Sequence, residues 1–259
     1  MKFDLHVHTT ASSDSIMETE ELYAAAAARG IDGIAVTNHD VLEKVESRDG
    51  IFVIPAIEVS TDAGHILIYF AKEDICKKLR KNERGVFLFS EVVREARAQG
   101  ALIFAAHPFS PEIPREDAVW EALDGVELFN SRIVHSRIFD ANERALSLCR
   151  EKKLAFSAGS DAHSKEEVGA AFIELDLTRD DMTSPDFEEK FKAALLSRKG
   201  KVFAGYNARK VVFSCKRKSY LKRKLYKKLI RSYPVCLYLW LRDIIKGKKR
   251  TGYIEIGVK

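Results

Sequence analysis

The sequence predicts an α/β protein in which parallel strands alternate with helices. Eight short apolar runs are spaced between residues 3 and 175, and stretches with one apolar helical face lie between many of them. Strands followed by helices of this length are typical of parallel βα units whose sheet is buried on both faces. The pattern does not distinguish an open sheet from a barrel, and both stay open at this point.

The predicted strands follow one another at short intervals. In chain order they are FDLHV (3–7), GIAVTNH (33–39), IFVIPAIEVS (51–60), HILIYFA (65–71), ALIFAAH (101–107), GVELFN (125–130), LAFSAGS (154–160) and AAFIEL (170–175).

Two of the intervening helices have clear terminal signals. The first covers TEELYAAAAARG, with Thr19 as the expected N-cap, Glu20 and Glu21 in its first turn, and Gly30 directly after its last turn. The second, EVVREARAQG, ends in the same way at Gly100. Each helix therefore has its own start and stop, as expected of separate βα units.

Charge divides the 259-residue chain into two parts. The formal net charge is +5, but the residues from 207 to the end hold 17 Lys and Arg against Asp243 and Glu255, which gives +15. Residues 1–206 then hold 26 basic and 36 acidic residues, which gives −10. We therefore expect an acidic body over residues 1–206 and a basic extension over residues 207–259.

The cysteines and the hydropathy of the chain indicate the cellular location that we expect for the protein. The four cysteines show no CxxC spacing, which argues against a zinc ribbon and a disulfide framework. The start MKFDLHVH leads straight into a strand pattern, and no apolar run reaches the roughly 18 residues that span a bilayer. We expect a cytoplasmic protein, either free or held at a membrane surface by its basic extension.

Most histidines stand at the ends of predicted strands. His6 and His8 end the first strand, His39 the second, His107 the fifth, and His163 follows the seventh. Glu58 lies near the end of a strand, His65 begins one, and only His135 lies away from such a position. Since the carboxyl ends of parallel strands meet on one side of an α/β fold, these groups are expected to converge.

The spacing and the chemistry of these residues predict a metal site. Residues i and i+2 of a strand point to the same side, so His6 and His8 can bind one ion, and Asp161 and His163 repeat the spacing. Imidazole and carboxylate without thiolate suit Zn, Mn, Fe or Co. Each residue alone has an ordinary alternative, because buried histidines are usually hydrogen-bonded core residues and Asp161 could cap a helix.

The motifs DLHVHTTASSD, GIAVTNHD, PAIEVS…GHILIYF, AHPF, GVELFNSR and SAGSDAH, in this order, resemble those of the PHP family, the polymerase and histidinol phosphatase superfamily of metal-dependent phosphoesterases. The resemblance covers roughly residues 1–206. It implies a distorted (β/α)7 barrel followed by the basic helical extension, and a cluster of three divalent ions, Mn, Zn or Fe.

The resemblance also implies a ligand set for each ion. The first would be held by His6, His8, Asp161 and a bridging Glu58, and the second by Glu58, His65 and His107. The third would be held by Asp14, His39 and His163. Many relatives have a histidine where this chain has Asp14, which leaves the third site in place but can change its metal preference.

The implied reaction is hydrolysis of a phosphate ester by attack of a metal-bridging hydroxide. Arg132 is the candidate phosphate clamp, because a guanidinium binds two phosphate oxygens at once. Asn130 is expected to orient substrate or a metal ligand, and Asp40 to orient a histidine or water or to donate a proton. The alternatives are helix capping and surface pairing for the first two, and a cap for Asp40.

The expected substrate is a small phosphorylated metabolite or a nucleotide. Only 41 residues separate His65 from His107, so the substrate-covering domain that some relatives carry there is absent and we expect an open site. Two alternatives remain, a nuclease acting on single-stranded nucleic acid ends and a metal-stabilised binding or tethering module that uses the basic tail.

The extension has its own pattern. Leu221, Leu225 and Leu229 recur every four residues and predict one apolar stripe on a basic helix, with an apolar run after Pro234. The stripe could pack on the barrel, face an anionic membrane surface, or belong to a segment that binds nucleic-acid phosphates. The sequence leaves these three partners open.

Overall fold

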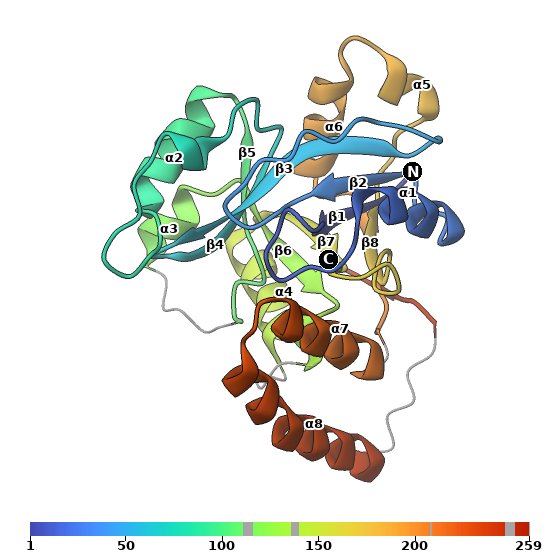
Figure 1. Ribbon diagram of the computed structural model, residues 1–259. Coiled ribbons are helices and arrows are strands. Elements are labelled where there is room, and N and C mark those ends of the chain that lie inside the picture. Colours follow the sequence, from blue (N-terminus) through green and yellow to red (C-terminus); the bar gives the residue numbers. More distant parts are fainter. Residues whose placement is uncertain (111–115, 136–139, 208, 247–251, 259) are drawn as a thin grey trace.

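The structure is a computed structural model of the whole chain, and it describes all residues except 111–115, 136–139, 208, 247–251 and 259. The side chains of residues 135, 209, 235, 236 and 239–246 are not described either. In the described part, helices cover the outer faces of a ten-stranded mixed sheet. The two helices of the C-terminal extension lie together on one side of the molecule (Figure 1).

The strands are β1 (Lys2–Val7), β2 (Gly33–Val36), β3 (Phe52–Thr61), β4 (Gly64–Tyr69), β5 (Leu102–Ala105), β6 (Gly125–Asn130), β7 (Ala155–Gly159), β8 (Ala171–Glu174), β9 (Lys201–Ala204) and β10 (Ile254–Ile256). The helices are α1 (Thr19–Ala28), α2 (Phe89–Ala98), α3 (Asp117–Glu121), α4 (Ala141–Lys152), α5 (Arg179–Thr183), α6 (Phe187–Leu196), α7 (Arg209–Lys222) and α8 (Tyr226–Lys246), with the 3₁₀ turns η1 (Ile75–Lys77) and η2 (Ile133–His135). All eight predicted strands are present as β1–β8.

The order of strands in the sheet is β10-β9-β8-β1-β2-β3-β4-β5-β6-β7. The sheet curls until the residues after β7 reach β1, where the Asp161 N–H donates to the His6 carbonyl at 2.7 Å and the His8 N–H to the Ala162 carbonyl at 2.8 Å. This curled half-barrel confirms the α/β prediction and agrees with the distorted barrel that the family resemblance implies.

The expectation of parallel βα units is correct for only part of the sheet. Strands β1–β2–β3 and β5–β6–β7 are parallel, but β4 is antiparallel to both of its neighbours, and so are the pairs formed by β8, β9 and β10. For β3 and β4 the cause is the two-residue loop between Thr61 and Gly64, with φ of +99° at Gly64, because so short a connection can join only antiparallel strands.

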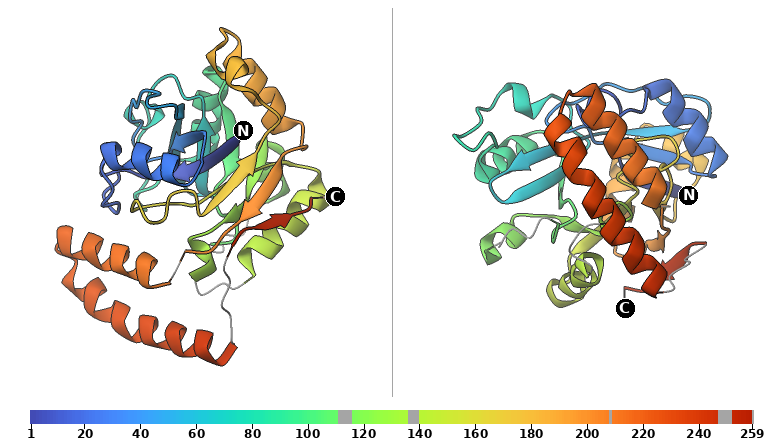
Figure 2. Two further views of the ribbon diagram at one scale, coloured as in Figure 1. Left: turned by 90° about the vertical axis from the view of Figure 1, so that its right-hand side faces the viewer. Right: turned by 60° about the horizontal axis from the view of Figure 1, so that its bottom comes forward.

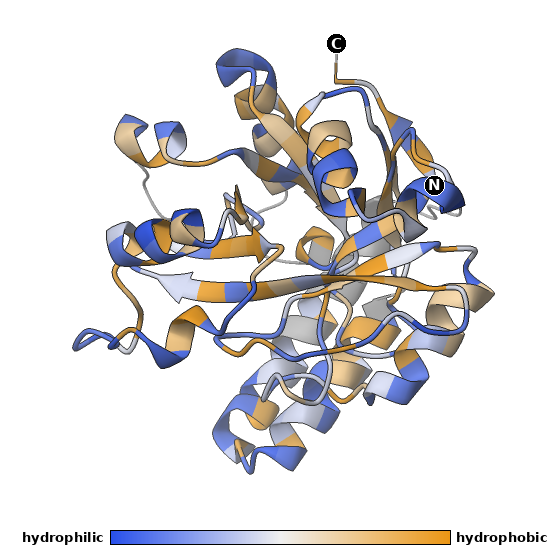
Figure 3. Ribbon diagram, turned by 90° about the horizontal axis from the view of Figure 1, so that it is seen from above, coloured by the Kyte–Doolittle hydropathy of each residue, from blue (hydrophilic) through white to orange (hydrophobic). Residues whose placement is uncertain are grey.

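The core lies on both faces of the sheet. Helix α1 packs Leu22, Tyr23 and Ala26 against Ile34 and neighbouring strand residues on one face, while the larger cluster on the other face includes Phe3, Phe104 and Phe156. Apolar residues gather on the strands, and the helix surfaces that point outward are mostly hydrophilic (Figure 3). The core therefore holds the strand ends in fixed positions.

The ends of the first two helices are close to expectation. Helix α1 begins at Thr19, so the N-cap is Glu18 and the predicted cap is off by one residue. Gly30 and Gly100, both with positive φ, follow their helices as predicted.

The C-terminal extension does not form the single helix that the leucine spacing predicts. Helix α7 ends at Lys222, Lys224 has a φ of +55°, and α8 begins at Tyr226, so Leu225 lies between the helices and the predicted stripe is broken. Pro234 lies inside α8. Among the described residues, no helix is both long and apolar enough to cross a bilayer.

The extension also returns to the sheet. Strand β10 pairs antiparallel with β9, with Ile254 opposite Ala204. Residues on both sides of the predicted boundary at 206 thus share one sheet, and the division into two domains stays a prediction.

Candidate metal centre

The nine predicted ligands lie together at one end of the curled sheet. Each has a nitrogen or oxygen atom within 3.8 Å of such an atom on another of the nine. They come from strands β1, β3 and β4 and from the loops that follow β1, β2, β5 and β7: His6, His8, Asp14, His39, Glu58, His65, His107, Asp161 and His163.

The first group has the size of a tetrahedral metal site. The Nε2 atoms of His6 and His8 are 3.0 Å apart, and Glu58 Oε2 lies 3.2 Å from the first and 3.3 Å from the second. Asp161 Oδ1 lies 3.3 Å from His8 Nε2 and 3.8 Å from His6 Nε2. Four ligands at bond lengths of about 2.1 Å would be separated by about 3.4 Å in a tetrahedron, so these atoms are spaced to share one ion.

Glu58 also serves the second predicted group through its other oxygen. Its Oε1 lies 2.8 Å from His65 Nδ1 and 3.1 Å from His107 Nε2. One buried carboxylate therefore faces both groups, which is the bridging position that the family resemblance implies.

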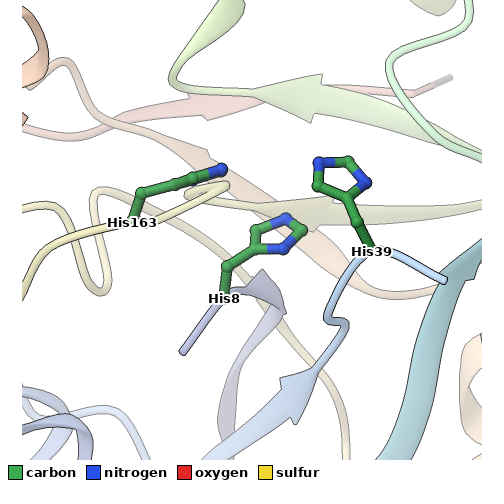
Figure 4. A group of neighbouring side chains, drawn as sticks. All are labelled: His8, His39 and His163. Atoms are coloured by element: carbon green, nitrogen blue, oxygen red, sulfur yellow. The ribbon is translucent and has the colours of Figure 1, made fainter. Parts of the chain in front are cut away.

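The third predicted group is assembled around Asp14. Its Oδ2 lies 3.1 Å from His163 Nε2 and 3.6 Å from His39 Nε2. His8 also belongs to this neighbourhood, because its ring points toward those of His39 and His163 and ligand atoms of the three lie within 4.8 Å of one another (Figure 4).

The nitrogen and oxygen atoms of the candidate ligands are better placed to bind a cation than to form hydrogen bonds with one another. His6 Nδ1 lies 2.9 Å from Glu127 and His8 Nδ1 lies 3.1 Å from the Ser12 hydroxyl. If these nitrogens carry the ring protons, two bare Nε2 lone pairs face each other beside two carboxylate oxygens, which is unfavourable without a positive ion between them. Asp14 Oδ1 is buried and has no hydrogen-bond partner, as expected of a ligand atom.

The pKa values describe a cluster with excess negative charge. Burial would raise the pKa of Glu58, but His39, His6 and His65 outweigh it and hold that pKa well below its usual range. Burial would lower the pKa of His6, but Glu127, Glu58 and Asp161 raise it well above its usual range. The carboxylates thus stay ionised and attract a proton onto His6 in the metal-free protein, and a metal ion would take the place of that proton.

Burial lowers the pKa of His39 to about 4 and lowers that of His163 as well. A neutral imidazole is the form that binds metal, so both rings are ready to act as ligands.

The most important residue that the sequence reasoning missed is Glu127, which is buried in β6. Its Oε1 lies 2.9 Å from His6 Nδ1, and its Oε2 accepts from the His107 N–H at 2.7 Å and from Asn130 Nδ2 at 3.0 Å. A carboxylate that fixes a ligating histidine orients the ring and raises its basicity. The available signal was a carboxylate inside the apolar run GVELFN.

Two further supports were also missed. The Ser12 hydroxyl contacts His8 Nδ1 and accepts from the His39 N–H at 2.7 Å. Asp4, fully buried in β1, accepts from the Ser160 and Gly169 N–H groups at 2.8 and 2.7 Å. Ser12 thereby connects the segments that carry His8 and His39, and Asp4 holds the loop that begins at Ser160 against β1.

Asn130 lies where it can orient a ligand. Its side-chain amide donates to Asp161 Oδ2 at 3.2 Å, which leaves Asp161 Oδ1 facing the histidines. The role of Asn130 in orienting substrate or a metal ligand stays a prediction, and its contact with Asp161 supports the second alternative.

Arg132 and Asp40 have protein partners. The Arg132 guanidinium is buried in an ion pair with Glu167, and burial, which would lower its pKa, is outweighed by Glu167, so the pKa is raised. Asp40 accepts from the Ser60 N–H at 2.7 Å and from Lys81 at 2.7 Å. The phosphate-clamp and proton-donor roles stay predictions for these two residues, and the side chain of His135 lies outside the described part of the chain.

The extension reaches the metal centre through α7. Cys215 is buried and its thiol donates to the His163 carbonyl at 3.4 Å. The next residue, Lys216, is half-buried, and burial followed by the charge of Arg132 lowers its pKa, whereas Asp161 and Glu167 raise it. A cavity of about 360 Å³ lies between α7 and the loop after His163, and its lining includes Lys210, Ser164 and Glu166 but none of the nine ligands.

The fold and the cluster together define a metal-dependent hydrolase built on a curled α/β half-barrel. The family described as PHP domain matches residues 4–163, and the one described as PHP-associated matches residues 139–195. The chain belongs to the PHP domain family. This membership confirms the resemblance seen in the sequence and, with it, the class of metal-dependent phosphoesterase.

Individual relatives agree with this placement. An uncharacterized protein of Methanocaldococcus jannaschii is 32% identical over 197 residues, covering 71% of this chain and 76% of the relative. A protein of Syntrophotalea carbinolica named as a probable phosphatase is 27% identical over 206 residues, covering 67% and 85%. A solved two-domain protein of Bacteroides vulgatus, described as containing a predicted PHP-like metal-dependent phosphoesterase, has a TM-score of 0.57 at 18% identity and covers 85% of this chain and 69% of that one.

Proposed function

We propose that this chain uses three divalent ions, Mn, Zn or Fe, to hydrolyse a phosphate ester of a small phosphorylated metabolite or nucleotide. The observation that carries the proposal is the arrangement around Glu58, whose two oxygens face two separate groups of histidines while Asp14 gathers a third. Ions held in this way would neutralise phosphate oxygens and provide an activated water.

The exposed side of the cluster indicates where substrate enters. His6, His8 and Glu58 are buried to within 1% exposure, whereas the side chains of Asp14, His39 and His65 are 33, 27 and 31% exposed. A phosphoryl group approaching from solvent would therefore meet the ligands of the second and third groups first. No substrate-covering domain lies between His65 and His107, in agreement with the open site expected from the sequence.

The residues of the chain hold the ligands in place and add positive charge at one edge. Glu127 fixes His6, and Asn130 fixes Asp161. Arg132 is already paired with Glu167, so the cation that would favour an anionic substrate is Lys216, which interacts electrostatically with Asp161. The name of the Syntrophotalea relative, a probable phosphatase, supports the same reaction.

The test is phosphate release measured together with metal content. The purified chain, loaded with Mn, Zn or Fe, is assayed on a panel of sugar phosphates, nucleoside monophosphates and nucleoside bisphosphates. We expect metal-dependent release from at least one group, removed by chelator and restored by the metal. A protein that binds these metals and releases no phosphate from any member would contradict the proposal.

The basic extension favours one other substrate, a single-stranded nucleic acid end, because its cations could hold a phosphodiester backbone. This alternative predicts faster cleavage of oligonucleotides than of mononucleotides, with a rate that falls steeply as salt is raised. Equal rates on the two substrates and a weak salt dependence would exclude it.

A further inference from the structure

One side of α8 carries a stripe of exposed apolar residues. Tyr226, Ile230, Tyr233 and Leu237 are 57, 69, 54 and 57% exposed. Their spacing of i, i+4, i+7 and i+11 places them on one face of the helix. Four large apolar side chains at this exposure form a continuous patch of the kind that marks an interaction site on a soluble domain.

The stripe lies along one flank of α8 and is exposed, although Tyr233 also contacts α7, with Arg217 Cζ 5.6 Å from the centroid of its ring. Helix α7 packs against the barrel with Val212, Phe213 and Cys215 buried. Helix α8 packs on α7, with Leu229 and the preceding linker residue Leu225 half-buried (Figure 2). In the left-hand view of Figure 2, α8 lies beyond α7 and farther from the sheet. Its apolar stripe is exposed to solvent, whereas of the three leucines predicted from the sequence to form a stripe, Leu225 and Leu229 are half-buried and Leu221 is 53% exposed.

Cations surround the stripe. Lys227, Lys228 and Arg231 are exposed in the same two turns, and Lys222 to Lys224 are exposed where α7 meets α8. Residues 209–231 hold eleven Lys and Arg and no acidic residue. A partner must therefore combine an apolar phase with a negatively charged surface.

An anionic bilayer meets both requirements. Apolar side chains can enter the boundary between headgroups and acyl chains while neighbouring Lys and Arg stay among the anionic headgroups. A nucleic acid would match the cations but would leave aliphatic Ile230 and Leu237 in water. A second copy would bring two strongly basic surfaces together, which costs free energy through like-charge repulsion.

We propose that α8 docks the protein on anionic lipid surfaces, with Tyr226, Ile230, Tyr233 and Leu237 inserted at the interface and the adjacent cations on the headgroups. The helix lies on the membrane and does not span it. This inference is independent of the proposed function, because it concerns none of the metal ligands.

The test measures sedimentation of the full-length, metal-loaded protein with vesicles of phosphatidylglycerol and phosphatidylcholine, and with vesicles of phosphatidylcholine alone. We expect binding to the anionic vesicles and at least about tenfold weaker binding to the neutral ones. In the double variant Ile230→Asp and Leu237→Asp, binding to anionic vesicles should fall at least about tenfold.

A matched control is Leu88→Asp and Leu196→Asp, since these leucines are each 40% exposed on the barrel. The control should bind vesicles as the wild type does, and both double variants should keep the metal content of the wild type, which shows that they are folded. Equal losses in the α8 and control variants would contradict the proposal.

Two other outcomes would also overturn it. Tight binding to single-stranded oligonucleotides without vesicle binding would assign the surface to nucleic acid. A wild-type dimer that becomes monomeric in the α8 variant, with no vesicle binding, would assign it to a second copy of the chain.

Discussion

The metal centre and the C-terminal extension differ in whether their charged residues are buried and paired or exposed. In the centre, Glu58, Glu127 and Asp161 are buried and each contacts histidine nitrogens at defined distances. Among the described side chains of the extension, most cations are exposed, and the sequence has no acidic residue between residues 209 and 231. Buried charge requires specific partners and therefore fixes a geometry, whereas exposed charge of one sign selects a partner from solution.

This contrast predicts its largest effect at Glu58, which joins two ligand groups. Glu58→Gln keeps the volume but removes the negative charge, so metal content should fall by at least one ion per chain and phosphate release by about a thousandfold, equivalent to roughly 4 kcal/mol. Metal quantification and the phosphate assay check both. The control is Glu189→Gln, an exposed position that should match the wild type. A Glu58→Gln protein with full metal content would show that this carboxylate does not bridge.

The next effect is expected at Glu127, which contacts the ligands without being one of the nine. In Glu127→Gln the histidine ring of His6 loses a charged acceptor, and metal affinity should fall about 10- to 100-fold. Titration of the metal-free protein measures this affinity. Excess metal should restore most of the rate, because the ligands themselves remain. A loss that no metal concentration restores would indicate that Glu127 acts on substrate.

A third change tests how closely strands β1 and β7 must pack beside the metal ligands. A Cβ added at Gly159 would lie 2.3 Å from His6 Cβ and 2.7 Å from His6 N. Gly159→Ala should therefore displace β1 from β7 and reduce the free energy of unfolding by about 1–3 kcal/mol, with lower metal content. Chemical denaturation measures the first quantity. Gly257→Ala, where nothing lies within 4 Å of the added atom, should leave stability unchanged. Equal stability of the two variants would contradict the close packing.

The smallest effect is expected at Lys216 of α7, where the extension meets the metal centre. Lys216→Ala removes a charge near Asp161, so the KM for a phosphorylated substrate should rise about threefold to tenfold, equivalent to roughly 1 kcal/mol, at nearly constant kcat. Lys218→Ala, exposed on the same helix, is the matched control and should leave both constants unchanged. If both variants raise KM equally, the effect is general charge attraction and not a local contact.

The sequence predicted well where the nine candidate ligands would lie, because their positions depend on one simple rule. His6, His39, His107 and His163 were recognised at strand ends, and the carboxyl ends of neighbouring strands meet whether the sheet is open or curled. The order of motifs then supplied Asp14 and the bridging role of Glu58. All nine residues lie together in the structure.

The residues that hold the candidate ligands in place could not be predicted in the same way. Glu127 and Asp4 lie in buried strands, and their partners are distant in sequence, as with Ser160 and Asp4, which are 156 residues apart. Only the closed fold brings such pairs together. The antiparallel β4 and the break at Lys224 were missed because a two-residue turn and a single residue with positive φ leave little trace in a hydropathy pattern.

The central claim is that His6 and His8 share a metal ion needed for phosphate ester hydrolysis. The most direct measurement is metal content per chain together with phosphate release, for the wild type and for His8→Ala. The account predicts bound first-row metal and metal-dependent release in the wild type, with both lowered in the variant. A His8→Ala protein with full metal occupancy and unchanged turnover would contradict it.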